Sequence, residues 1–245
     1  KAKSLDLKAT KYFNSTGLPD RGRQNTMSTQ DIFILARYIL ENYPEILTIT
    51  TIQYVEVPDR GYIRRNTNPL LNQVKGVDGL KTGYTKKAGY CLVTTAVIDE
   101  TCEDDDFFRL ISIVMGTESV QKQKKMGKTL LQYGIDNFNK KILVDETMPI
   151  DIINVANSRK EEVEIYPSRS FSTIIKSGDN TDIDIIIDEN LKAPLKKGTK
   201  VGKVILLKNG QVLDEIDLIT LERVSKEGII IKVLRFLKKL FLSKS

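Results

Sequence analysis

The stretch Asp78-Gly79-Leu80-Lys81-Thr82-Gly83-Tyr84-Thr85, followed by Ala88-Gly89-Tyr90, decides how the chain is interpreted. Two β-rich runs come directly after it, residues 90–98 and 107–115, so we expect these segments to form strands of one sheet. The tripeptide Lys81-Thr82-Gly83 is short enough to occur by chance, and an ordinary strand with a surface lysine would explain it. Its meaning therefore depends on the rest of the sequence.

The composition excludes several kinds of chemistry. The chain has 245 residues with 38 Lys or Arg, 32 Asp or Glu, two Cys and no His. A Ser-His-Asp triad, a Cys-His pair and a His-ligated metal site are therefore impossible within it. Two cysteines cannot build a thiolate zinc site or a disulfide framework. We expect no metal and no cofactor, and any proton transfer must use Lys, Tyr, Asp or Glu.

In context, the Lys-Thr-Gly stretch resembles the third motif of the penicillin-recognising serine enzymes, whose set is S-x-x-K, S-x-N and K-T-G. The chain as a whole resembles the D-alanyl-D-alanine carboxypeptidase family of low-molecular-mass penicillin-binding proteins. The segments that carry the resemblance occur in the family's order and are Phe13 to Asp20, Met27 to Asp31, Asn66 to Leu71, Val77 to Leu92, Ala193 to Gly198 and Val201-Gly202.

The resemblance implies an α+β fold, namely a partial transpeptidase domain of the penicillin-binding and β-lactamase type. It also implies a small all-β domain and an amphipathic C-terminal helix. Lys81, Thr82 and Gly83 would act in catalysis, with the Thr82 hydroxyl donating to the substrate carboxylate and the Tyr84 amide in the oxyanion hole. The reaction would remove the terminal D-alanine from peptidoglycan stem peptides through an acyl-enzyme, and β-lactam antibiotics would bind the same site.

The chain departs from the family in the place of its nucleophile. The family's serine and lysine, and its second motif, are expected in a segment upstream of Lys1. The string Ser119-Val120-Gln121-Lys122 has the S-x-x-K spacing but follows Lys-Thr-Gly, so we interpret it as chance. Ser177-Gly178-Asp179-Asn180 is interpreted as a turn. Because the chain begins without Met and Lys1 reads as the middle of a helix, we expect a fragment or a processed product that is inactive alone.

A second departure concerns the group that holds the substrate carboxylate. The family often carries an Arg after the strand that ends near Met115-Gly116, and no Arg follows Arg109 in this part of the chain. Gln123 or one of the lysines Lys122 and Lys124 would have to substitute. A lysine supplies a point charge rather than the bidentate fork of an arginine.

Three regions of the chain differ in the pattern of their apolar, polar and charged residues. Residues 1–139 are predicted to be the C-terminal portion of the catalytic domain, with helices after Ser28 and over 122–138. The second helix offers Met126, Leu130, Tyr133 and Ile135 for one face. Residues 140–222 alternate with period two and contain an Asn209-Gly210 hairpin, which predicts an all-β domain.

Residues 223–245 form the third region, predicted to be a basic amphipathic anchor. They carry seven basic residues and one acid, so the remaining 222 residues are neutral overall, which argues against a nucleic-acid partner. On a helical wheel the apolar residues gather on one arc and the cations on another, as in helices that lie on an anionic membrane surface. The expected membrane residues are Lys232, Arg235, Phe236, Lys239 and Leu240. The alternative is a helix packed on the body or on a partner.

Three function hypotheses remain open. The first is a serine D-Ala-D-Ala carboxypeptidase on the extracytoplasmic face of a bacterial membrane. The second is a non-catalytic chain that binds cell-wall peptides or a membrane partner. A β-lactamase is the third, disfavoured by the β domain and the anchor. We interpret Cys91 as a core thiol, Cys102 as exposed and unpaired, and the acidic residues 99–106 as a solvated loop.

Overall fold

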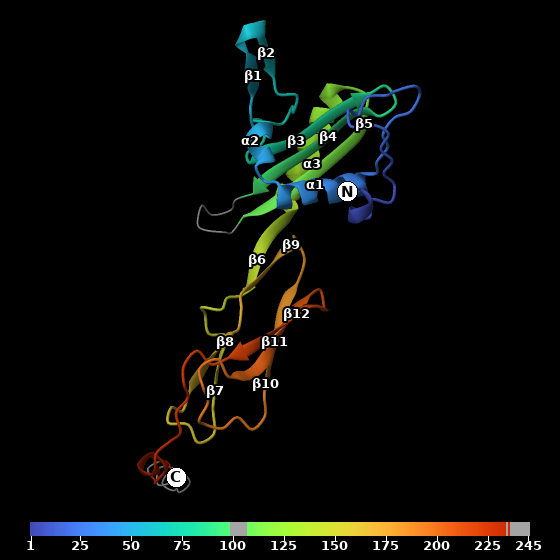
Figure 1. The fold of residues 1–245 in the computed structure, drawn as a ribbon. Helices are drawn as coiled ribbons and strands as arrows, with labels where there is room; N and C mark the ends of the chain where they lie inside the picture. Colours follow the sequence, from blue (N-terminus) through green and yellow to red (C-terminus); the bar gives the residue numbers. More distant parts are fainter. Residues whose placement is uncertain (99–106, 234, 236–245) are drawn as a thin grey trace. The chain divides into compact units, whose positions relative to one another are not determined.

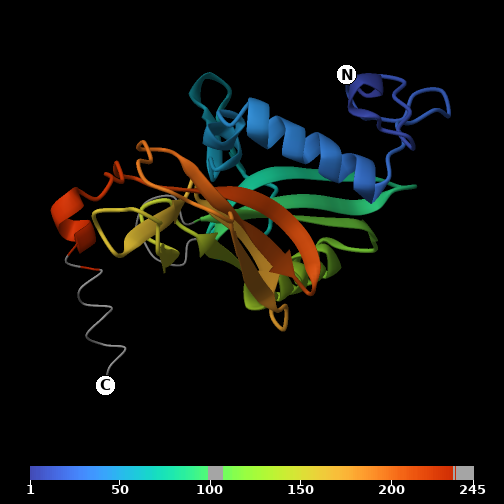
Figure 2. The ribbon, with the colours of Figure 1, turned by 90° about the horizontal axis from the view of Figure 1, so that it is seen from below.

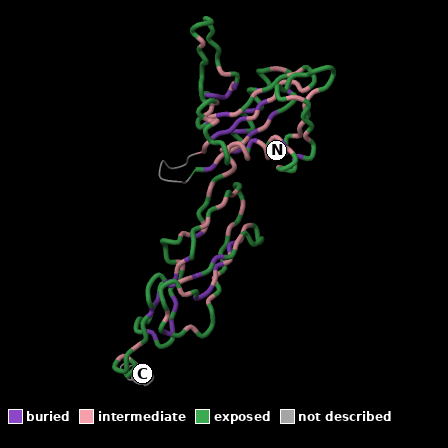
Figure 3. The backbone as a smooth tube through the Cα atoms, viewed as in Figure 1, coloured by how far each residue is buried: buried purple, intermediate pink, exposed green. Residues whose placement is uncertain are grey.

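The computed structural model describes residues 1–98, 107–233 and 235, and the chain divides into two compact units, Lys1–Phe138 and Asn139–Ser245 (Figure 1). Each unit has buried residues of its own (Figure 3). The predicted fold class is confirmed, because the first unit mixes helices with a sheet and the second is built from strands. The acidic loop, Cys102, Phe236, Lys239 and Leu240 lie outside the described residues.

An antiparallel sheet in the order β3-β4-β5 forms the centre of the first unit. Its strands are β3 (Val77–Thr85), β4 (Gly89–Ile98) and β5 (Phe108–Thr117), so the two strands predicted after the Lys-Thr-Gly stretch are confirmed. Thr82 lies opposite Leu92, and Leu92 lies opposite Val114. No strand among the described residues pairs with the outer edge of β3.

Helices α1 (Thr29–Asn42) and α3 (Val120–Asn137) lie on opposite faces of this sheet (Figure 2). Helix α1 begins as predicted, because the Ser28 hydroxyl accepts a hydrogen bond from the Asp31 amide at 3.1 Å. The buried Asp31 carboxylate also accepts from the Ala9 amide at 2.9 Å and the Thr10 hydroxyl at 2.7 Å. These bonds tie the N-terminal segment to the helix.

The predicted apolar face of α3 is wrong. Met126, Leu130 and Tyr133 are exposed, and the helix instead buries Gln123, Gly127, Leu131 and Gly134. The glycines permit a close approach to the sheet: a Cβ on Gly127 would lie 2.9 Å from Leu92 Cδ2, and one on Gly134 would lie 2.7 Å from Leu110 Cδ1. Backbone contact thus replaces the large apolar side chains that the prediction relied on.

Short elements complete the first unit: η1 (Lys3–Leu5), α2 (Ile46–Thr50), β1 (Tyr54–Val57), η2 (Pro58–Arg60) and β2 (Tyr62–Arg65). Strands β1 and β2 form an antiparallel hairpin that is interrupted by η2, and helix α2 precedes it. Lys1 precedes the 3-10 turn η1 and is not inside a helix, contrary to the prediction.

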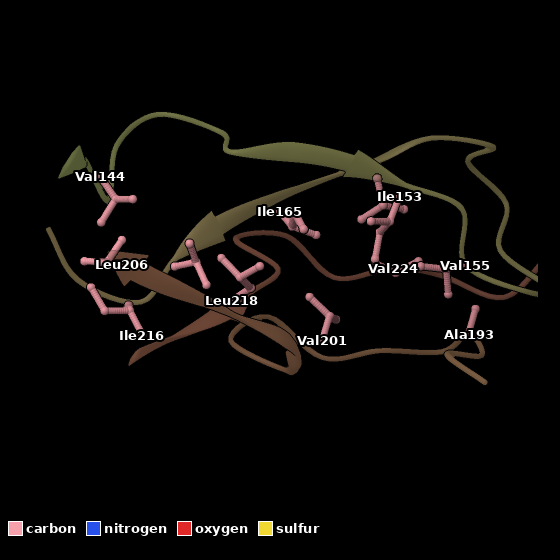
Figure 4. Packing of buried hydrophobic residues seen from close by; sticks show 12 residues of the cluster. Val144, Ile153, Val155, Ile165, Ala193, Val201, Leu206, Ile216, Leu218 and Val224 are labelled. Atoms are coloured by element: carbon pink, nitrogen blue, oxygen red, sulfur yellow. The ribbon is translucent and has the colours of Figure 1, made fainter. Parts of the chain in front are cut away.

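The second unit contains β6 (Phe138–Val144), β7 (Asp151–Ile153), β8 (Val163–Pro167), β9 (Phe171–Lys176), β10 (Thr181–Ile187), β11 (Lys200–Lys208) and β12 (Gln211–Ile219). A sheet in the order β10-β11-β12-β8-β7 and a β6-β9 pair enclose a core of aliphatic side chains that includes Ile165, Leu206 and Leu218 (Figure 4). The predicted Asn209-Gly210 hairpin is confirmed, with φ of 51° and 76°.

The segment Ser177 to Asn180 is a turn between β9 and β10, as predicted. The carboxylate of Asp179 lies 2.8 Å from the Lys208 ammonium and accepts from Asn209 Nδ2 and the Lys176 amide at 2.8 Å each. Hydrogen bonding by Lys208, above all, lowers the pKa of Asp179. Asp179 therefore serves the fold of the second unit.

The described start of the C-terminal tail is helical, and Ile229, Ile230 and Val233 are exposed. Lys232 is exposed as well. Arg235 differs from its predicted role as a headgroup contact: Nη1 donates to the Ser158 carbonyl at 2.8 Å and lies 2.9 Å from a Glu227 carboxylate oxygen. Among the described residues, no helix is both long and apolar enough to cross a membrane.

Candidate active site

Strand β3 forms one wall of a cavity of about 930 Å³ in the first unit. The N-terminal segment supplies another part of the lining with Tyr12, Thr16, Gly17, Leu18 and Asn25, and the start of α3 supplies Val120 and Gln123. The Lys-Thr-Gly stretch, Tyr84 and Gln123 therefore meet at one cavity, as their common assignment to a site requires. Lys122 is not among the lining residues.

The Thr82 hydroxyl faces a second hydroxyl. Thr82 Oγ1 lies 2.6 Å from Thr67 Oγ1, and both residues line the cavity. The Lys81 ammonium donates to the Thr82 carbonyl on its own strand. Thr82 therefore presents a hydroxyl that is already part of a hydrogen-bonded pair, and the positive charge of Lys81 lies at the Thr82 carbonyl.

Gly83 leaves the wall of the cavity open. A Cβ built on this residue would meet no atom within 4 Å, so the space beside the strand is available to a ligand. Tyr84 follows it, and its ring packs on Tyr90 of the neighbouring strand with centroids 4.3 Å apart. No described strand pairs with the outer edge of β3, so this edge suits a peptide that binds as an added strand.

Polar contacts fix the start of β3. Arg109 Nη1 lies 2.8 Å from both carboxylate oxygens of Asp78 and donates to Thr95 Oγ1 at 2.7 Å. The Thr50 hydroxyl donates to the Asp78 carbonyl, and Asn68 Nδ2 donates to the Gly79 carbonyl, both at 2.7 Å. The backbone is therefore held from both sides immediately before Lys81.

At the start of α3, Ser119, Lys122 and Gln123 each make a contact within the first unit. The Ser119 hydroxyl accepts from the Lys122 amide at 3.1 Å, so it caps the helix. The Lys122 ammonium pairs with Glu118, and its hydrogen bond lowers the pKa of that carboxyl. Gln123 is 3% exposed, and its Nε2 donates to the Cys91 carbonyl at 2.7 Å. The Gln123 amide group, which was predicted to bind the substrate carboxylate, therefore already donates to the backbone of β4.

A second, apolar cavity of about 470 Å³ separates α1 from the sheet. Its lining comprises aliphatic side chains of α1, among them Ile32, Leu35 and Ile39, and the sheet residues Val93 and Met115. Cys91 lies between the two cavities, with its thiol half-buried and 3.5 Å from the Ala88 carbonyl. The α1 face of the sheet is therefore less filled than the α3 face.

Sequence reasoning did not identify Thr67 and Asn68 as parts of the site. Both lie within Asn66 to Leu71, which was noted only for its resemblance to the approach to the motif. Their contacts with β3 span 15 and 11 residues, so no local periodicity reveals them. The one available signal is the Asn-Thr-Asn-Pro composition, which is typical of side chains that bond to backbone at turns.

Two family models match parts of this chain. Residues 1–119 match the family model of D-alanyl-D-alanine carboxypeptidase, and residues 138–226 match that of the penicillin-binding protein 5 C-terminal domain. D-alanyl-D-alanine carboxypeptidase DacF of Bacillus subtilis is 31% identical over 94% of this chain and 58% of its own length. The DacA protein of Haemophilus influenzae is 28% identical over 91% of this chain and 55% of its own length.

Solved structures show the same relationship. Penicillin-binding protein 5 from Haemophilus influenzae superposes with a TM-score of 0.58 at 28% identity, over 92% of this chain and 64% of that one. PBP3 from Streptococcus pneumoniae, at 19% identity, shares the fold with a TM-score of 0.60, over 91% of this chain and 67% of that one.

The fold is thus that of the penicillin-binding proteins. The chain belongs to the D-alanyl-D-alanine carboxypeptidase family, and it spans a little more than half the length of the relatives above.

Proposed function

We propose that this chain is the larger part of a serine-type D-Ala-D-Ala carboxypeptidase that trims peptidoglycan pentapeptides and is acylated by β-lactams. The observation that carries the proposal is the open edge of β3, where Lys81, Thr82 and Gly83 line a cavity of about 930 Å³. Family membership and the names of the relatives support the same reaction.

In this proposal the Thr82 hydroxyl donates to the terminal carboxylate, and the Lys81 ammonium supplies attractive charge beside it. The Gly83 position lets the peptide backbone lie against β3. The Tyr84 amide is one of the oxyanion donors. A serine attacks the penultimate D-alanine carbonyl carbon, the C–N bond breaks, and D-alanine leaves with a proton on its nitrogen. Water then hydrolyses the ester and restores the serine.

The serine and its lysine base are proposed to belong to a segment of the complete protein that precedes Lys1. The chain covers 58% of DacF, so such a segment has room to exist. The apolar cavity beneath α1 supports this proposal, because an amphipathic element packed there would cover the side chains of Ile32, Leu35 and Ile39 beside Lys81. The 245-residue chain by itself is then expected not to turn over substrate.

The complete protein is proposed to act at the extracytoplasmic face of the bacterial membrane, with residues 223–245 on the anionic lipid surface. In the described part of this tail, Arg235 bonds to the second unit while Ile229, Ile230 and Val233 stay exposed. Docking through Arg235 thus leaves the apolar side of the helix available to lipid. Deleting residues 229–245 is expected to abolish sedimentation with anionic vesicles, and unchanged sedimentation would contradict the anchor.

The proposed activity is tested by D-alanine release from a pentapeptide stem, using protein extended at its N-terminus to the length of DacF. We expect release by this form and a loss of at least about 100-fold in kcat/KM in Thr82→Val, since a charge-assisted hydrogen bond to the carboxylate is removed. Thr48→Val, on the exposed surface of α2, is the matched control. Absence of D-alanine release by the extended form would refute the activity.

A further inference from the structure

The contact between two hydroxyls suggests a role for a residue that no sequence motif includes. We propose that Thr67 is a positioning residue for the ligand carboxylate: its hydroxyl donates to Thr82 and so turns the Thr82 proton toward the ligand. This inference rests on the proposed function of the β3 cavity and adds to it the origin of its preference for a free carboxylate.

Each threonine hydroxyl has one proton and can also accept hydrogen bonds. Thr67 Oγ1 and Thr82 Oγ1 lie 2.6 Å apart, so one of them donates to the other. A carboxylate only accepts, and therefore Thr82 must give its proton to the ligand. The proton between the two threonines then comes from Thr67.

The resulting chain of donors runs from Thr67 to Thr82 and on to the carboxylate. In such a chain each hydrogen bond polarises the next and strengthens it, particularly beside a charged acceptor. Without the Thr67 hydroxyl, Thr82 loses the partner that fixes the direction of its proton. The Thr82 hydroxyl would then donate or accept equally well.

The backbone around Thr67 is held in a way that suits this role. Asn66 Nδ2 donates to the Ile52 carbonyl at 2.8 Å and to the Thr50 carbonyl at 3.0 Å. On the other side, Asn68 Oδ1 accepts from the Leu70 amide at 3.0 Å, while its Nδ2 donates to the Gly79 carbonyl at 2.7 Å. Thr67 therefore lies between two anchored asparagines, and its distance from Thr82 is set before any ligand arrives.

A specificity follows from the direction of the protons. A carboxylate offers a donating hydroxyl two charged acceptor oxygens, whereas a terminal amide offers one uncharged oxygen, so a site whose hydroxyl is committed to donating favours the carboxylate. Thr67 is thus expected to affect the discrimination between these two termini more than it affects the stability of the fold.

The test compares two peptides that both end in D-Ala-D-Ala, one with a free carboxylate and one with a C-terminal carboxamide. Their dissociation constants for the 245-residue chain are measured by titration with ¹⁵N NMR. We expect the wild-type chain to bind the carboxylate peptide at least tenfold tighter. Thr67→Val should reduce that ratio to about twofold, and Thr67→Ser, which keeps the hydroxyl, should restore it.

Thr48→Val is again the control and should leave the ratio unchanged. A well-dispersed spectrum of Thr67→Val verifies that the variant is folded. If Thr67→Val retains the wild-type ratio, the role of Thr67 is refuted while the proposed function stands. If the wild-type chain binds neither peptide, this inference fails, and the proposed function is decided separately by D-alanine release from the extended form.

Discussion

The two faces of the β3-β4-β5 sheet are packed in opposite ways. On one face, α3 approaches so closely that Gly127 and Gly134 are buried against the strands, and Leu131 is 1% exposed. On the other face, α1 stands away from the sheet and leaves an apolar cavity of about 470 Å³, next to the Lys-Thr-Gly stretch. The first face therefore stabilises the unit, whereas the second borders the Lys81 to Gly83 stretch that we assign to function.

Matched truncations give the largest expected effect. Leu131→Ala on the filled face should cost about 3 kcal/mol, because it leaves a cavity among fully buried neighbours. Leu35→Ala on the hollow face should cost less than about 1 kcal/mol, since Leu35 is already half-exposed beside a cavity. Native-state hydrogen exchange of the β4 amides measures both. Equal costs would contradict the distinction between the faces.

Gly83→Val is expected to lower the affinity for peptide without lowering the stability of the first unit. A valine meets no atom within 4 Å at its Cβ, so the free energy of unfolding should change by less than about 0.5 kcal/mol. The affinity for the carboxylate peptide should fall more than about tenfold, because the side chain occupies the place of the peptide backbone.

Gly89→Ala is the contrasting variant for the same strand pair. Its φ is +67° and its new Cβ would lie 2.9 Å from the Gly116 carbonyl carbon, so it should destabilise the sheet. If Gly83→Val destabilises the unit as much as Gly89→Ala does, the space beside β3 is not open.

Gln123→Leu tests the contribution of a buried polar side chain on the α3 face of the sheet. The variant leaves the Cys91 carbonyl without the Gln123 donor in a buried setting, at a cost of about 1 to 2 kcal/mol. Hydrogen exchange at Cys91 and Leu92 reports the loss. If peptide affinity falls while stability is unchanged, Gln123 binds ligand as the sequence analysis expected.

The smallest expected changes in stability come from substituting the two buried glycines of α3. Gly127→Ala places a Cβ against Leu92 and Leu70, which are fully buried and cannot move, so we expect a net loss of about 1 kcal/mol. Gly134→Ala meets the tip of the half-buried Leu110, which can turn away, and the higher helix propensity of alanine should make it neutral or stabilising. Thermal unfolding followed by circular dichroism ranks the two variants.

The sequence predicted those elements whose signals are local. The helix start after Ser28, the β-rich runs of β4 and β5 and the Asn209-Gly210 turn each depend on a few neighbouring residues, and all are present. Helix α2 was missed because Ile46 to Thr50 is rich in β-branched residues, which favour strands, although the chain is helical there.

The packing of α3 was mispredicted for a different reason. Apolar periodicity marks the large side chains, whereas this helix approaches the sheet through Gly127 and Gly134, which carry no such signal. The candidate site shows the same limit: Lys81 to Tyr84 could be predicted from a motif, but the Thr67 hydroxyl reaches Thr82 only through the fold. The role of Gln123 could not be anticipated because its partner lies 32 residues away.

The most direct test of the account is the intact mass of the protein after incubation with benzylpenicillin, measured for the 245-residue chain and for a form extended at the N-terminus to the length of DacF. The account predicts a stable gain of one penicillin on the extended form and an unchanged mass for the chain alone. An adduct on the 245-residue chain, with Ser119 the first residue to examine, or no adduct on either form, would contradict it.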